Sequence, residues 1–178
     1  MGKKIYIAFV HKGSGSYALG IDDVEVTNQK GPKAISNLTV TPGENGALSA
    51  TLTWKNPQTD GTGTDITGEL AIGIYRDNKL LTAITGNVTP GGTSSYTDTS
   101  MDNGMHTYSV IAKTGEGQSK AISKRAYIGE DVPAEVENLN AYVSEGQTII
   151  TWNAPTKGMN KGYINTENLT YTVERKIG

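Results

Sequence analysis

Hydrophobic and polar residues alternate along four stretches in the middle of the chain. The hydrophobic positions of these stretches are Leu38 and Val40, then Ala50, Leu52 and Trp54, then Leu70, Ile72 and Ile74, then Tyr108, Val110 and Ala112. A period of two residues places every second side chain on the same face of an extended strand. Each stretch is therefore predicted to be a strand with one face in a core and the other in water.

Weaker alternation predicts three more strands, at residues 80–85, 94–99 and 121–128. Residues 76–79 read Arg-Asp-Asn-Lys and lie between two strand stretches, which predicts a turn. Residues 102–104, Asp-Asn-Gly, stand where the chain must reverse before Tyr108. Seven short antiparallel strands within about one hundred residues predict an all-β, immunoglobulin-like sandwich.

The same pattern of residues occurs twice. The interval is 101 residues from Pro32 to Pro133 and 98 residues from Trp54 to Trp152. A period near one hundred residues, with length differences in the loops, indicates an array of sandwich-sized units. We predict a complete unit at residues 32–129 and the first three strands of a second unit at 133–178. Residues 1–28 are predicted to be the last strands of a preceding, incomplete β domain.

The composition limits the classes of partner. The 178 residues include 22 Gly, 6 Pro and no Cys, and the net charge is -2 with no basic stripe. Nucleic acid and anionic membranes are therefore not expected as partners. The longest apolar run, residues 5–10, is too short to cross a membrane, so no membrane insertion is expected. Any export signal of the parent protein is expected upstream of this sequence.

Several motifs together resemble a fibronectin type III domain across residues 32–129. They are Pro-x-x-x-x-Asn-Leu-Thr-Val from Pro32, Leu-Thr-Trp54 with Pro57, Ile-Tyr75-Arg76, and Asn-Gly-Met-His-Thr-Tyr-Ser-Val-Ile-Ala ending at Ala112. The long loop after Trp152, with Lys-Gly-Met-Asn-Lys-Gly-Tyr-Ile at 157–164, is similar to modules in secreted multidomain adhesins and peptidases of Bacteroidetes. The resemblance implies an extracellular or cell-surface location. The loop at 114–119 has no Arg-Gly-Asp, so integrin binding is not carried over.

The segments 5–11 and 21–26 resemble the last two strands of the jelly-roll adhesin domain of gingipain-type proteins. That resemblance implies a structural Ca²⁺ site in the parent domain, with Asp22 or Asp23 as a ligand. Adjacent residues of a strand point to opposite faces, so at most one of these two carboxylates serves a given ion. The other ligands would come from strands outside this chain, and no cofactor is expected in the chain itself.

Other candidate residues have a structural interpretation that we prefer. Trp54 and Trp152 are of the type that stacks on sugars, but their phase in the second strand predicts burial in the core. Tyr108 is predicted to be a tyrosine-corner residue whose hydroxyl bonds nearby backbone. The loop from Asp60 to Asp65 resembles a cation loop but lacks the EF-hand spacing, which favours a solvated loop.

The chain has no constellation typical of catalysis. Its histidines, His11 and His106, lie in different units, and without cysteine there is no Cys/His pair or zinc cluster. No Gly-x-Ser-x-Gly elbow, P-loop or dinucleotide fingerprint occurs. We therefore predict that this chain is not an enzyme.

Three hypotheses about function follow. The first is a non-catalytic spacer or adhesive module of an exported bacterial protein, whose loops at 56–69 and 86–95 contact a host extracellular protein or glycan. The second is an accessory domain of a secreted peptidase or glycoside hydrolase whose catalytic domain lies outside this sequence. The third is pairing of the incomplete ends, residues 5–10 and 139–152, with each other or across chains.

Overall fold

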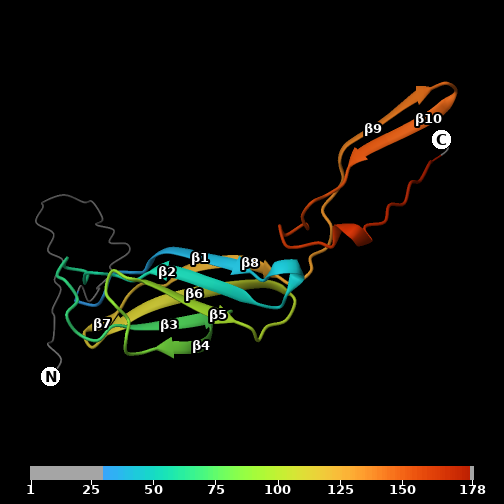
Figure 1. Ribbon diagram of the computed structural model, residues 1–178. Coiled ribbons are helices and arrows are strands. Elements are labelled where there is room, and N and C mark those ends of the chain that lie inside the picture. The colour runs from blue at the N-terminus through green and yellow to red at the C-terminus, as the bar shows by residue number, and fades with distance from the viewer. Residues whose placement is uncertain (1–29, 177–178) are drawn as a thin grey trace, which may run out of the picture.

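The computed structural model describes residues 30–176 (Figure 1). The predictions for residues 1–28, including the candidate calcium ligands Asp22 and Asp23 and the residue His11, lie outside the described residues. Within the described part of the chain, no helix is both long enough and apolar enough to span a bilayer.

The strands of the first unit form two antiparallel sheets that face each other (Figure 1). One sheet has the order β1-β2-β5, and these strands span Ser36–Pro42, Ala50–Lys55 and Thr93–Asp98. In the other sheet β4 (Lys79–Ile84) pairs with β3 (Ala71–Arg76), and β3 pairs with β6 (Gly104–Thr114). The far side of β6 carries β7 (Gly117–Gln118) and β8 (Ile122–Ile128). A short 3₁₀ helix, η1 (Glu44–Gly46), connects β1 to β2.

Burial follows the alternation seen in the sequence. The inward residues form one core between the two sheets: Ile35, Leu38, Ala50, Leu52, Trp54, Leu70, Ile72, Ile74, Met101, Tyr108, Val110, Ala112 and Ile128. All seven predicted strands are present, and the all-β, immunoglobulin-like (fibronectin type III) fold class is confirmed. Burial of this apolar surface is the main source of stability, because the chain has no cysteine and so no disulfide.

Two local features show how particular residues shape the sheets. Between β3 and β4, Asp77 and Asn78 have φ of 49° and 66°, the conformation of a tight two-residue hairpin turn. Ser119 lies between β7 and β8, and its buried hydroxyl accepts a hydrogen bond from the backbone N–H of Ala112 in β6. This N–H therefore does not donate to a neighbouring strand. The hydroxyl of Ser119 in turn donates to the Lys120 carbonyl. The strand beside β6 is therefore interrupted without leaving these groups unpaired.

The second unit begins with the same two strands as the first. β9 (Glu137–Ser144) and β10 (Gln147–Asn153) pair antiparallel, as β1 and β2 do. Asn138 in β9 and Asn37 in β1 both have a φ of 53°, so even the local irregularity is repeated. The β9–β10 hairpin extends away from the end of the sandwich where β8 finishes (Figure 1).

The third predicted strand of the second unit is not formed. Residues 169–176 are extended beside the hairpin, with the Tyr171 ring 5.2 Å from the Trp152 ring, but they are not assigned to a strand. In the first unit the equivalent strand β3 pairs with β4 and β6, and residues 133–178 contain no counterpart of either. A segment without a ladder partner cannot complete its backbone hydrogen bonds as a strand.

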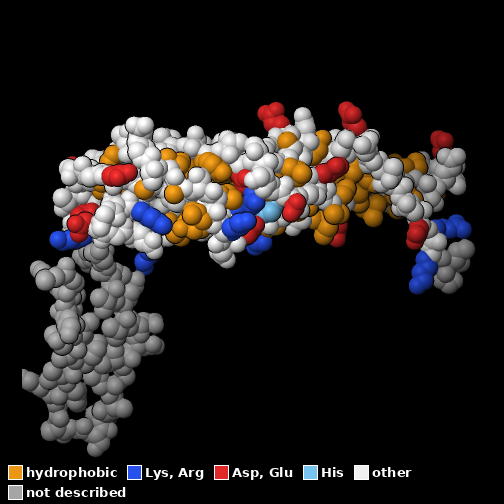
Figure 2. Space-filling model, turned by 90° about the horizontal axis from the view of Figure 1, so that it is seen from below, with side chains coloured by type: hydrophobic (Ala, Val, Ile, Leu, Met, Phe, Trp, Pro, Cys, Tyr) orange, Lys and Arg blue, Asp and Glu red, His pale blue; other side chains and the backbone are white. Residues whose placement is uncertain are grey.

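The hairpin consequently leaves apolar side chains in solvent. Figure 2 shows hydrophobic side chains gathered at the end of the molecule formed by the hairpin and the last residues. The exposed residues there include Leu139, Tyr142, Val143, Ile150, Tyr171 and Val173. The prediction that both tryptophans are core residues is confirmed for Trp54, whereas Trp152 is only partly buried because its face of the hairpin lacks a second sheet.

Candidate functional site

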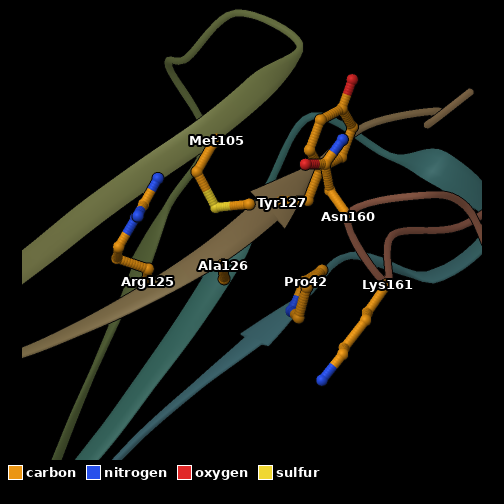
Figure 3. Close-up of a pocket in the computed structure, with 7 residues that line it drawn as sticks. All are labelled: Pro42, Met105, Arg125, Ala126, Tyr127, Asn160 and Lys161. Carbon is orange, nitrogen blue, oxygen red and sulfur yellow. The ribbon is translucent and has the colours of Figure 1, made fainter.

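A groove lies where the first unit meets the second. It has a volume of about 440 Å³ and is lined by Pro42, Met105, Arg125, Ala126, Tyr127, Asn160 and Lys161 (Figure 3). The first five residues belong to strands β1, β6 and β8 of the sandwich, and the last two belong to the loop after β10. The groove therefore exists only while this loop rests against the end of the sandwich.

Asp131 holds the loop in place. This residue is 4% exposed and lies in the linker between β8 and β9. One carboxylate oxygen, Oδ2, accepts hydrogen bonds from the backbone N–H of Asn160 at 2.7 Å and of Gly162 at 3.1 Å. The other, Oδ1, accepts from the Asn160 side-chain amide at 3.0 Å and from the backbone N–H of Val132 at 2.8 Å. A buried carboxylate with four donors is fully satisfied.

The electrostatics of Asp131 agree with this geometry. Burial alone would raise the pKa of the carboxyl group, since it disfavours the charged form. The hydrogen bonds from Asn160, Gly162 and Val132 outweigh burial and hold the pKa below its ordinary value. Asp131 is therefore an anion at neutral pH, and its hydrogen bonds to the loop are charge-assisted.

Close backbone packing completes the junction. The Asp131 N–H donates to the Tyr163 carbonyl at 2.7 Å, and Glu130 forms a bridge with the same residue. A Cβ added to Gly162 would lie 2.7 Å from Cδ1 of Tyr127 on β8. Only glycine lets the loop backbone approach the tyrosine ring this closely. The loop thus contacts both the linker and the last strand of the sandwich.

The charge of the groove is positive, although the whole chain is slightly acidic. Arg125 and Lys161 line it, and none of its lining residues is acidic. Neither cation has an ion-pair partner among residues 30–176. Met105, Ala126 and Pro42 supply an apolar floor between the two charges (Figure 3). This combination suits binding of an anionic group attached to an apolar or ring-shaped body, because an arginine fork matches carboxylate geometry.

A second polar cluster lies within the sandwich, and sequence analysis missed it. Asp98 at the end of β5 is 1% exposed and forms a salt bridge with Arg76 at the end of β3, which joins the two sheets. The second guanidinium nitrogen of Arg76 donates to the Ser100 carbonyl at 2.8 Å. Burial would lower the pKa of Arg76, but the bond to Asp98 prevails and raises it, so the guanidinium is charged. A lone arginine and a lone aspartate on separate strands gave no signal that they meet.

The prediction for the Tyr108 hydroxyl was wrong about its partner. The ring is in the core as expected, but the hydroxyl donates to the Asp98 carboxylate at 3.2 Å and approaches the Met101 sulfur at 3.3 Å, not the backbone. Burial and the neighbouring Asp98 charge both raise the pKa of this phenol, which stays protonated as a donor. A carboxylate is a stronger acceptor than a peptide carbonyl, which explains the preference.

The loop that begins at Asp60 uses its carboxylate internally. The Asp60 oxygen accepts from the backbone N–H groups of Thr62 and Thr64, both at 2.9 Å, and from the Thr62 hydroxyl at 2.6 Å. The Thr62 hydroxyl bond is the main cause that lowers the pKa of this carboxyl group. No group of three or more His, Asp or Glu residues arranged to hold a metal occurs in residues 30–176. The structure thus gives Asp60 a role in shaping its own loop.

His106 also has local partners. Its Nδ1 lies 2.7 Å from the Asp77 carboxylate and its Nε2 lies 2.9 Å from the Asp102 carbonyl. Burial would lower the pKa of the imidazole, but these two bonds prevail and raise it above 6.5. Both ring nitrogens are therefore occupied in fixing the ends of the β3–β4 and β5–β6 connections.

Comparisons by sequence find no matching family profile and no matching curated protein. Comparison of structures finds a likeness to the Clostridium perfringens spore cortex lytic enzyme SleM, with 10% identity and a TM-score of 0.41 over 55% of this chain and 28% of that one. Another likeness is to the FN1–FN3 domains of chicken CNTN1, with 17% identity and a TM-score of 0.41 over 71% of this chain and 44% of that one. This chain therefore corresponds to less than half the length of either structure.

Proposed function

We propose that this chain is a non-catalytic extracellular binding and spacer module of an exported bacterial multidomain protein. The observation that carries the proposal is the junction at Asp131, where three hydrogen bonds, two from Asn160 and one from Gly162, tie the second unit to the linker that follows the first. Adjacent domains move relative to each other unless the contact between them is specific and well packed. A joint held in this way sets the direction as well as the distance between neighbouring units.

The shape of the first unit supports the spacer role. The chain enters the sandwich near Pro32 at one end and leaves it after Ile128 at the other (Figure 1). Units with entry and exit at opposite ends extend a chain by their full length. A second groove, whose lining includes Asp60, Asp65, Glu69 and Glu116, lies beside Pro32 at the entry end of the sandwich. The groove lined by Arg125 and Lys161 lies beside the linker at the exit end.

The groove supports the binding role. Its volume of about 440 Å³ lies in the range of small-ligand sites, which is roughly 300 to 1,000 Å³. Arg125 and Lys161 provide the charge for a carboxylate or sulfate, and the apolar floor provides contact for a sugar ring or side chain. We therefore propose an acidic glycan or an acidic segment of a host extracellular protein as the ligand.

Binding of the whole chain to a glycan array and to extracellular-matrix proteins tests the ligand. We expect an acidic glycan or protein to bind and the Arg125→Ala/Lys161→Ala variant to lose roughly tenfold or more in affinity, as for two lost charge-assisted contacts. Lys55→Ala/Lys79→Ala is the matched control, because it removes two exposed positive charges elsewhere on the sandwich. An equal loss of affinity from both variants would contradict the groove as the binding surface. No binding at all would refute the binding role, and only the spacer role would remain.

A further inference from the structure

The loops that follow β2 and β10 make the same backbone contacts with the linkers that precede their units. In the first unit the bonds run from Lys33 N to Thr59 O, from Gly61 N to Gly31 O, from Asp60 N to Thr64 O and from Gly63 N to Asp60 O. In the second they run from Ala134 N to Lys157 O, from Met159 N to Val132 O, from Gly158 N to Gly162 O and from Lys161 N to Gly158 O. The intervals are those of the sequence repeat, 101 residues in the linker and 98 in the loop.

Two further features establish the equivalence. A bridge joins Pro32 to Asp60 in the first unit, and the equivalent bridge joins Pro133 to Gly158 in the second. Gly63 and its counterpart Lys161 both adopt a left-handed backbone, with φ of 93° and 65°. We call residues 59–64 the first loop and residues 157–162 the second loop. They are one structure built from different side chains.

A carboxylate occupies the same place in both loops. In the first loop Asp60 accepts from the backbone N–H groups of Thr62 and Thr64. In the second loop the equivalent N–H groups are those of Asn160 and Gly162, and both donate to Oδ2 of Asp131. The first loop therefore supplies its own carboxylate, whereas the second receives one from the linker.

The second residue of each loop explains why the carboxylate comes from different positions. The counterpart of Asp60 is Gly158, and a Cβ added there would overlap Cβ, Cγ and Oδ2 of Asp131. The absence of a side chain at position 158 is what makes room for the linker carboxylate. The counterpart of Asp131 in the preceding linker is Lys30, which has no carboxylate to offer. Each unit thus has one carboxylate for the same pair of amides, from one of two positions.

We infer that the loop after the tryptophan strand is a docking site for a single carboxylate. The second residue of the loop, at position 60 or 158, decides where this carboxylate comes from. An aspartate at that position closes the site, as in the first loop. A glycine opens it to an aspartate placed two residues before the proline that starts the unit, as in the second loop. Because the linker aspartate follows the last strand of the preceding unit, only the open form adds a charge-assisted side-chain contact to the backbone bonds between linker and loop. This inference rests on the proposed spacer function and names the contact that gives it.

Amide hydrogen exchange of the full chain tests whether the carboxylate can be supplied from either position. In Asp131→Gly we expect the N–H groups of Asn160 and Gly162 to exchange roughly tenfold faster or more, because they lose a charged acceptor. In Asp131→Gly/Gly158→Asp we expect slow exchange to return, since the loop now carries its own carboxylate. Glycine is used at position 131 because even the Cβ of alanine would collide with the new aspartate. Gly158→Asp alone is expected to disrupt the loop by placing two carboxylates in one site.

Substitutions in the opposite sense test the same inference independently in the first loop. Asp60→Gly should expose the N–H groups of Thr62 and Thr64, and Asp60→Gly/Lys30→Asp should protect them again. Slow exchange of β6 amides reports in each variant that the sandwich is folded. Failure of both double variants to restore protection in a folded chain would overturn the inference, as would unchanged exchange in Asp131→Gly.

The failure of this inference and that of the spacer function are distinguishable. The spacer function is measured by the distance between labels on the two units. If the amides respond as expected but the two units are mobile in the native chain, the docking site stands and the spacer function fails. If the distance is fixed but the amides do not respond, the spacer function stands and the docking site is wrong.

Discussion

Replacing Trp54 by alanine is expected to lower the free energy of unfolding of the sandwich by about 3 to 5 kcal/mol. The indole is 1% exposed and lies between the two sheets, so the change removes much apolar contact and leaves a cavity. Its N–H also donates at 2.9 Å to the side chain of Asn56, which is 3% exposed. Asn56 in turn donates to the Thr89 carbonyl and the Ser94 hydroxyl. The change therefore also deprives a buried amide of one partner.

Urea unfolding followed by far-ultraviolet circular dichroism measures this loss, and two variants separate its causes. Trp54→Phe keeps most of the apolar volume, so its smaller cost reports the hydrogen bond to Asn56 and part of the packing. Trp152→Ala is the matched control, because Trp152 is the repeat counterpart but is only partly buried. We expect it to leave the main unfolding transition nearly unchanged. A similar loss from both alanine variants would contradict the assignment of the core to the first unit.

Replacing Asp98 by alanine is expected to cost about 3 kcal/mol, the lower end of the range for removal of one partner from a buried ion pair. Asp98 is 1% exposed and Arg76 is 17% exposed at the side chain, so the arginine left behind keeps some access to water. Tyr108 and Ser100 would also lose an acceptor. The same urea experiment measures the loss.

A double variant separates the ion pair from its surroundings. Asp98→Leu/Arg76→Met removes both charges and is expected to cost less than Asp98→Ala, because no buried charge remains unpaired. Arg76→Met alone should cost as much as Asp98→Ala or more, since Asp98 is the more buried partner. Costs of Asp98→Leu and Arg76→Met that simply add in the double variant would contradict a coupled pair.

The sandwich was predictable from the sequence because each of its strands has one face in the core and one face in solvent. Leu52 and Trp54 alternate with polar residues, and Ile72 and Ile74 are separated by Gly73. This period of two places their side chains on the face that meets the core. The third strand of the second unit was not formed because a strand also depends on its partners. Residues 169–176 have the right alternation but lack the neighbours that β3 has.

The polar contacts were not predictable in the same way. Asp131 bonds to residues 29 and 31 positions further along the chain, and three of its four donors are backbone N–H groups, which every sequence contains. Tyr108 was assigned to the core correctly, but the Asp98 carboxylate that it meets comes from the other sheet. Nothing in the local pattern of either strand specifies that pairing.

The repeat did contain one signal for the junction. Aligned by the repeat, Lys30 and Asp60 correspond to Asp131 and Gly158, so a carboxylate changes position between the linker and the loop. The glycines at 158 and 162 also mark places where another part of the chain comes close to the backbone. The meaning of these differences depends on knowing that the linker and the loop lie side by side.

The central claim is that Asp131 fixes the relative direction of the two units. The most direct test of this claim is a measurement of the distance between them. The chain has no cysteine, so nitroxide labels attach only at Ser95→Cys on β5 and Thr148→Cys on β10, which are both exposed. We predict a single narrow distribution of label distances by electron double resonance, and a clearly broader one when Asp131→Gly is added. A broad distribution in the native background, or one that Asp131→Gly leaves unchanged, would contradict the account.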